Sequence, residues 1–171
     1  MSWSQNSKIS WIKFSDLACP YCQQFYNSNL ANNLKITYGD KINSYFILFP
    51  LDIHPTSYDA SLLAECFWEQ KWTTWFFELV WKIYKEWKTD KDFILNTVVS
   101  LWADKQKLEQ CFSDKIYASK LDTQINLAKS LFSITWTPTS VFVNNETWEY
   151  EIMIWMYEYN KITSMIDNLI K

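Results

Sequence analysis

Two kinds of hydrophobic pattern divide the chain and limit the folds it can adopt. Short strand-like segments lie near both ends, whereas residues from about 57 to 132 carry apolar side chains at helical spacing. The predicted elements are strands at 9–14, 42–49, 140–144 and 149–154, a helix that begins at residue 19, a helix at 158–170, and four or five helices between 57 and 132. Thr89, Asp90 and Asp104 are the candidate N-caps in this helical part, and its last helix is expected at about 114–131. This order predicts an α/β fold in which a βαβ unit (residues 1–55) and a ββα unit (133–171) are separated by an all-helical insertion (56–132).

The size and charge of the chain exclude several classes of protein. With 171 residues, 49% of them hydrophobic, the chain has enough apolar side chains for a packed core and should fold alone. The longest apolar stretches, such as Tyr45 to Leu51, are too short for a bilayer span, and no signal peptide is recognisable in the chain as given. The net charge is -3 and the 16 basic residues are all Lys, so the bidentate Arg contacts used in nucleic-acid recognition are missing. Nucleic acid is therefore not a predicted partner.

The motif Cys19-Pro20-Tyr21-Cys22 directly follows the first predicted strand and begins a helix. Pro20 suits the first helical turn, because its missing N–H group would have no partner there. The start of a helix stabilises a thiolate through free N–H groups and the helix dipole. Cys19 is therefore the predicted nucleophile, which forms a mixed disulfide with a substrate, and Cys22 is the thiol that resolves it.

The other cysteines and the single histidine offer an alternative, a zinc site of which the motif would be one half. Cys66, Cys111 and His54 are scattered rather than paired, whereas a structural zinc site needs four ligands. The sequence therefore favours redox chemistry without a metal. A Cys–His hydrolase would depend on His54 alone, and we expect this histidine to be a loop residue bonded to the backbone.

A second chemical feature is Thr137-Pro138-Thr139, which precedes a predicted strand. We expect Pro138 to be cis and to lie in contact with Cys19. A cis proline there would turn neighbouring backbone groups toward an extended peptide. An ordinary trans proline in a loop is the alternative.

A wider pattern is carried by four segments: Phe14-Ser15-Asp16-Leu17-Ala18-Cys19-Pro20-Tyr21-Cys22, Phe49-Pro50-Leu51-Asp52-Ile53-His54-Pro55, Ala64-Glu65-Cys66 and Thr137-Pro138-Thr139-Ser140-Val141-Phe142-Val143-Asn144. From about residue 9 to the C-terminus, the chain resembles the DsbA-like family of thiol:disulfide oxidoreductases. The resemblance implies a thioredoxin fold interrupted by a helical insertion, with no cofactor besides the Cys19–Cys22 dithiol. It also implies a set of residues that contact the substrate chain: Pro20, Tyr21, Thr137 and Pro138.

The resemblance further implies partners and a location. Cysteine-containing exported polypeptides would be the substrates, a membrane redox protein would reoxidise the dithiol, and the protein would act as a monomer outside the cytoplasm. Relatives with both cysteines imply that Cys66 and Cys111 form a structural disulfide, whereas two buried free thiols are the alternative. Two other functions stay open, namely a disulfide isomerase or reductase of the same fold and a non-catalytic peptide-binding or chaperone module.

One residue departs from the family pattern. Six residues before the first cysteine, the family often has a buried Glu that handles the proton of the resolving thiol, and this chain has Lys13. A buried cation there would favour a thiolate but could not act as that base. A Lys that extends to solvent is the alternative. Asp16, nearer the motif, is expected to cap the turn or to face water.

The balance of Gly and Trp is abnormal. The chain has 1 Gly and 11 Trp, whereas average usage of about 7% Gly predicts roughly twelve Gly at this length. Trp87 and Trp102 follow predicted helices, Trp148 lies at a hairpin turn and Trp136 precedes Thr137, all places that favour Gly. We predict that most of these Trp are Gly in the natural protein, encoded by a reassigned UGA codon, and that the first three have positive φ. A Trp-rich binding surface is the alternative.

Overall fold

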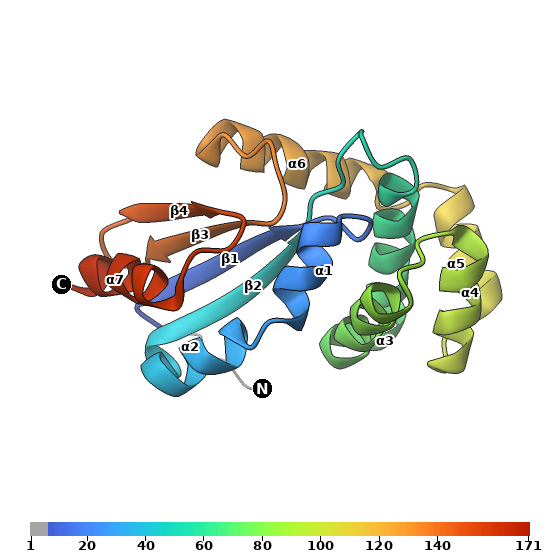
Figure 1. Cartoon of the computed structure of the whole chain (residues 1–171). Helices are drawn as coiled ribbons and strands as arrows, with labels where there is room; N and C mark the ends of the chain where they lie inside the picture. The colour runs from blue at the N-terminus through green and yellow to red at the C-terminus, as the bar shows by residue number, and fades with distance from the viewer. Residues whose placement is uncertain (1–6) are drawn as a thin grey trace.

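The computed structural model describes residues 7–171, apart from the side chains of residues 72 and 73. Its four-stranded sheet has the order β2-β1-β3-β4, formed by β1 (Ile9–Ser15), β2 (Ile42–Leu48), β3 (Thr139–Asn144) and β4 (Tyr150–Ile154). β1 is parallel to β2, and β3 is antiparallel to both β1 and β4. Figure 1 shows the sheet at one end of the molecule and a group of helices at the other. The predicted α/β fold class is confirmed.

Four helices cover the two faces of the sheet: α1 (Pro20–Asn27), α2 (Leu30–Tyr38) and α7 (Tyr159–Ile170) on one face, and α6 (Ala118–Phe132) on the other. This division follows from β1, because alternate residues of a strand point to opposite faces. Ile9 and Trp11 are buried with α1, α2 and α7, whereas Phe14 is buried with Ala128 of α6. A short 3-10 turn, η1 (Gly39–Lys41), joins α2 to β2, and Gly39 has positive φ at the end of α2.

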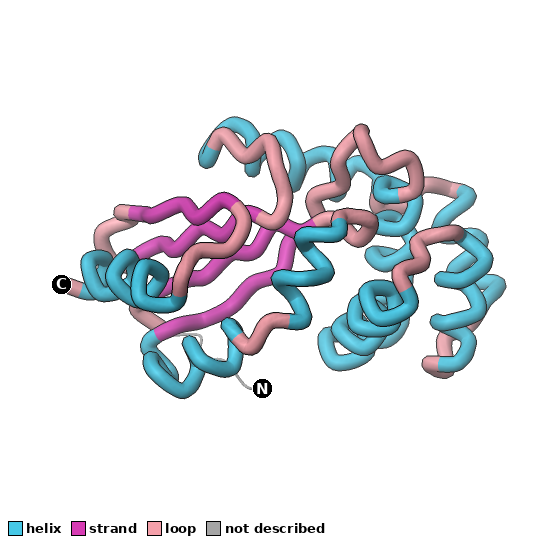
Figure 2. Tube along the Cα trace, viewed as in Figure 1, coloured by secondary structure: helices cyan, strands magenta, loops and turns pink. Residues whose placement is uncertain are grey.

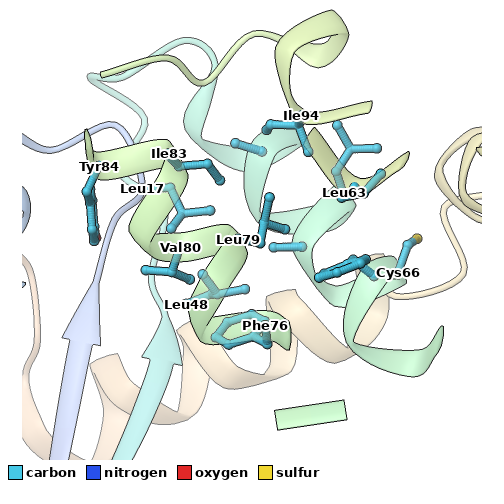
Figure 3. Close-up of a cluster of buried hydrophobic side chains, with 14 of the residues drawn as sticks. Leu17, Leu48, Leu63, Cys66, Phe76, Leu79, Val80, Ile83, Tyr84 and Ile94 are labelled. Atoms are coloured by element: carbon cyan, nitrogen blue, oxygen red, sulfur yellow. The ribbon is translucent and has the colours of Figure 1, made fainter. Parts of the chain in front are cut away.

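Between β2 and β3 the chain forms a helical bundle with a core of its own: α3 (Ser57–Glu86), α4 (Lys91–Ser100), α5 (Lys105–Ser113) and α6. Figure 3 shows part of this core, in which Leu63 and Leu79 of α3 lie beside Ile94 of α4. Asp90 and Asp104 cap α4 and α5 as predicted, because each carboxylate accepts a backbone N–H from the first turn. No helix within residues 7–171 is long and apolar enough to cross a membrane.

The start of α6 differs from the prediction, which placed it near Asp114. Asp114 instead ends α5, and Lys115 has a positive φ of 50°, so the chain turns before α6 begins at Ala118.

The helical bundle is also held together by a covalent bond. Cys66 of α3 and Cys111 of α5 form a disulfide with Cα atoms 6.0 Å apart. The bond joins residues 45 positions apart in the sequence.

Tryptophan occupies most of the left-handed backbone positions. Of the six non-glycine residues with positive φ in the described chain, four are Trp: Trp87 (55°), Trp102 (62°), Trp148 (64°) and Trp155 (64°). The first three were predicted, and the fourth was not. Figure 2 shows the loops between helices and strands in which these residues lie. Their side chains are 48%, 81%, 76% and 54% exposed, so burial of the rings does not offset the backbone cost.

Candidate active site

The two cysteines of the motif lie between the sheet and the helical bundle, just beyond the end of β1. Cys19 is the N-cap of α1, with extended backbone, and the exposed Pro20 occupies the first turn as predicted. Both thiols are free, and the residues are only 3% and 1% exposed. The Sγ atom of Cys22, one turn into the helix, accepts a hydrogen bond from the Asp16 N–H at 3.4 Å. The dithiol is therefore fixed to both the strand end and the helix start.

The two thiols differ in proton affinity. A hydrogen bond from the Cys22 thiol is the largest influence on Cys19. Together with backbone N–H groups of Cys22 and Tyr21, it lowers the pKa of Cys19 from 9.0 to about 6, although burial opposes the shift. Burial raises the pKa of Cys22 well above 9.0, and the adjacent Cys19 raises it further. Near neutral pH, Cys19 is therefore a thiolate that can act as the nucleophile, whereas Cys22 keeps its proton until it attacks a mixed disulfide.

Alkylation of Cys19 by iodoacetamide is expected to be half-maximal near pH 6 and to slow as the pH falls further, because the thiolate is the reactive form. Cys22→Ala should move this midpoint up toward 9.0, since the main hydrogen bond to the thiolate is lost. Cys22→Ser is the matched control, because a hydroxyl can still donate. Mass spectrometry of the alkylated chain measures the rates. A wild-type midpoint near pH 9 would contradict the expectation.

The segment that precedes β3 lies beside the reactive thiol. Antiparallel pairing places Thr139 opposite Phe14, so the residues before Thr139 run past the end of β1. The Thr137–Pro138 peptide bond is cis, and the Cys19 thiol donates to the Thr137 carbonyl at 3.5 Å. The buried Thr137 hydroxyl has no hydrogen-bond partner in the thiol state among residues 7–171, and it lowers the pKa of Cys19. It is therefore a donor available to the thiolate.

Exposed apolar side chains surround the approach to this segment. Tyr21 is 54% exposed and stacks on Trp155, with ring centroids 5.7 Å apart. Trp136 and Met156 are also more than half exposed. The Trp155 N–H donates to the Pro138 carbonyl at 2.8 Å, which holds the end of β4 against the cis-proline segment. A polypeptide that reached Cys19 would meet this surface.

Asp16 and His54 form a pair that was not predicted from the sequence. The Asp16 side chain is fully buried, so the expectation that it faces water is wrong. Its Oδ1 accepts the Ala18 N–H at 2.7 Å, which is the predicted capping of the turn. Its Oδ2 lies 2.7 Å from His54 Nδ1, so the His54 ring is bonded to a carboxylate rather than to the backbone as expected. Tertiary folding brings these two residues together across 38 positions of sequence.

The zinc alternative lacks its ligands. Cys66 and Cys111 are bonded to each other, so neither thiol is available to a metal. Within the described part of the chain, no group of three or more His, Cys, Asp or Glu side chains is placed to hold a metal ion.

Comparison with known proteins places the chain in a family. Residues 4–168 match the family model described as Thioredoxin. The chain belongs to the thioredoxin family. No curated protein matches it in a sequence search.

Solved structures share the whole fold of this thioredoxin-family chain. DsbA2 from Pseudomonas aeruginosa is 22% identical, with a TM-score of 0.77 over 98% of this chain and 92% of that chain. α-DsbA1 from Wolbachia pipientis is 22% identical, with a TM-score of 0.75 over 96% and 86% of the two chains. Oxidised BdbD from Bacillus subtilis is 16% identical, with a TM-score of 0.77 over 97% and 89%. The resemblance to the DsbA-like fold, with its helical insertion, is thus confirmed.

Lys13 is the residue at which the sequence departs from the pattern that the DsbA-like resemblance implies. Burial lowers the pKa of the Lys13 amine from 10.5 to about 8, although the residue keeps part of its surface exposed. Its Nζ atom lies 4.7 Å from the centre of the Trp11 ring. On β1, Lys13 stands opposite Phe46 of β2 and Ser140 of β3. Lys13 is thus a half-buried residue in the middle of the sheet.

Proposed function

We propose that the protein is a DsbA-like thiol:disulfide oxidoreductase that introduces or exchanges disulfides in exported polypeptides. The observation that carries the proposal is a free Cys-X-X-Cys pair at the start of α1, with the Cys19 sulfur 3.5 Å from the Thr137 carbonyl. In this setting the pKa of Cys19 is lowered to about 6 and that of Cys22 is raised well above 9.0. A stabilised thiolate favours the reduced form of the pair, which makes the disulfide form a stronger oxidant. One structural neighbour, α-DsbA2 from Wolbachia pipientis, is described as a thiol-disulfide exchange protein.

The proposed oxidation needs no cofactor. A substrate thiolate attacks the Sγ atom of Cys19 in the oxidised pair, the Cys19–Cys22 bond breaks, and Cys22 leaves with the electron pair. The raised pKa of Cys22 lets it take up a proton, which discourages reversal. A second substrate thiolate then attacks the sulfur that is bonded to Cys19. The substrate disulfide forms, Cys19 leaves as the stabilised thiolate, and two electrons have passed to the protein.

The same proposal assigns the substrate contact to the residues around Cys19. Tyr21 is exposed beside the motif, and Pro20 is exposed at the helix start. The Thr137 carbonyl lies 3.5 Å from the Cys19 sulfur, and Pro138 follows it through a cis peptide bond. A substrate cysteine bonded to Cys19 would therefore lie between the start of α1 and the cis-proline segment.

The second disulfide supports a location outside the cytoplasm. Cys66 and Cys111 are bonded, and such structural disulfides persist mainly in oxidising compartments. There the protein would act as a monomer on cysteine-containing exported polypeptides. A membrane redox partner would reoxidise the Cys19–Cys22 pair after each transfer.

The reduction potential of the Cys19–Cys22 pair tests the direction of transfer. Equilibration with glutathione of known ratio, followed by mass spectrometry of alkylated protein, gives its value. We expect a value near that of DsbA, about -120 mV, because the Cys19 thiolate is stabilised. A value near that of thioredoxin, about -270 mV, would overturn the oxidase assignment and favour a reductase of the same fold.

A further inference from the structure

The Asp16 carboxylate joins three segments next to the dithiol. It accepts the N–H of Ala18 at 2.7 Å, the N–H of Leu51 at 2.9 Å and the hydroxyl of Ser57, and its fourth bond is to His54 Nδ1 at 2.7 Å. These donors belong to the turn before Cys19, the loop after β2 and the start of α3. A fully buried carboxylate is stable when its oxygens are satisfied in this way.

The backbone of Asp16 binds the same site from the other side. Its N–H donates to Cys22 Sγ at 3.4 Å, and its carbonyl accepts the Cys19 N–H at 3.2 Å and the buried hydroxyl of Tyr84 at 3.1 Å. Tyr84 lies near the end of α3, more than seven turns of helix from Ser57. One residue thus connects both cysteines to both ends of the longest helix.

We infer that Asp16, held by His54, is a positioning residue that fixes the 16–19 turn and so aims the first N–H groups of α1 at the Cys19 sulfur. The inference deepens the proposed thiol–disulfide function and rests on it. The Asp16 side chain acts through the turn, since its four bonds go to donors other than the two thiols.

Positioning and direct charge predict opposite results. If Asp16 acted by its negative charge, Asp16→Asn would remove repulsion of the nearby thiolate and lower the pKa of Cys19. If Asp16 positions the turn, the result is different, because the NH2 group of Asn is a donor and cannot accept the hydrogen bonds that the carboxylate oxygen accepted. The turn then shifts, and the N–H groups of α1 no longer point at the Cys19 sulfur. The pKa of Cys19 then rises. The sign of the change therefore separates the two roles.

The experiment is a titration of the reduced full-length chain by thiolate absorbance near 240 nm, in which the raised pKa of Cys22 leaves Cys19 to titrate alone near pH 6. Asp16→Asn should raise the midpoint by about one pH unit. His54→Leu should raise it in the same direction, because it leaves one carboxylate oxygen short of a donor. His54→Asn should stay near wild type, since its amide N–H can replace Nδ1–H.

Asp52→Asn is the matched control, because Asp52 lies in the same loop as His54 and is exposed. It removes one charge without touching the pair, and its midpoint should equal that of wild type. If Asp16→Asn and His54→Leu unfold at lower urea concentrations while the midpoint of the Cys19 titration stays unchanged, Asp16 has a merely structural role and the inference is wrong. A lowered midpoint would also overturn it. If Asp16→Asn does not fold, the comparison of His54→Leu with His54→Asn decides.

This test is independent of the direction of electron transfer. A wild-type reduction potential close to that of thioredoxin would reject the oxidase proposal. The shifts of the Cys19 titration midpoint would still test the positioning role of Asp16. Conversely, unchanged titration midpoints in the Asp16 and His54 variants would reject the positioning role. The wild-type Cys19–Cys22 pair could still have the reduction potential of an oxidase.

Discussion

Cys19→Ser is expected to abolish disulfide transfer to a reduced polypeptide. The substitution removes the sulfur that a substrate thiolate attacks, and a hydroxyl at the same helix start cannot form the mixed disulfide. We expect the rate to fall to the uncatalysed background, at least about a thousandfold by comparison with other deletions of a nucleophile. The return of activity in a disulfide-dependent enzyme, refolded in the presence of the oxidised protein, measures the transfer.

Cys22→Ser should instead trap an intermediate. The Cys19 thiolate can still attack a disulfide-containing peptide, but the buried residue 22 can no longer release it. A covalent adduct that survives a non-reducing gel and disappears with dithiothreitol is the expected product. A double Cys19→Ser, Cys22→Ser variant should form no adduct. An adduct in the double variant would mean that a different residue reacts.

The double variant also separates catalysis from binding. Tyr21 and Trp155 are exposed and stacked beside the motif, and such a surface would serve a peptide-binding or chaperone module without any thiol chemistry. In that case, the double variant would protect an aggregating polypeptide as well as wild type does. Under the proposed function, it keeps its fold but loses transfer.

The local parts of the fold and site followed from the sequence, because they depend on short-range physics. A strand, a Cys-Pro start and an apolar helix place Cys19 at an N-terminus whatever surrounds it. Likewise, the carboxylates of Asp90 and Asp104 bind N–H groups three residues away, so their capping roles depend on no distant partner.

The parts that failed depend on distant contacts. His54 was expected to bond to the backbone, but folding of the loop after β2 brings it to Asp16, and no local pattern marks that meeting. The start of α6 was misplaced because Lys115, an ordinary helix former, adopts a left-handed conformation there.

The tryptophans with positive φ lead to a prediction about the free energy of unfolding. A Trp at positive φ is unfavourable by about 1 to 2 kcal/mol, because its Cβ approaches the following carbonyl oxygen, and Gly has no such cost. Trp102→Gly and Trp148→Gly should therefore each raise the free energy of unfolding by about 1 kcal/mol in urea titrations. Trp11 is the internal control, because it is 1% exposed and does not have positive φ. Trp11→Gly should lower the free energy of unfolding by about 3 to 5 kcal/mol, as other large core deletions do.

The intact mass of the protein purified from its native host decides whether those positions are Gly. The printed chain has a mass of 20.6 kDa. Each Trp that is replaced by Gly, the residue favoured at left-handed positions, lowers the mass by about 129 Da. We expect a deficit of several such steps, with Trp87, Trp102, Trp148 and Trp155 among the replaced positions, because all four combine positive φ with exposed side chains. A measured mass equal to that of the printed chain would end the hypothesis. Replacement of Trp155 would also uncover one face of Tyr21, whose ring now stacks on it, while the hydrogen bonds of Cys19 and Cys22 use no Trp side chain and would remain.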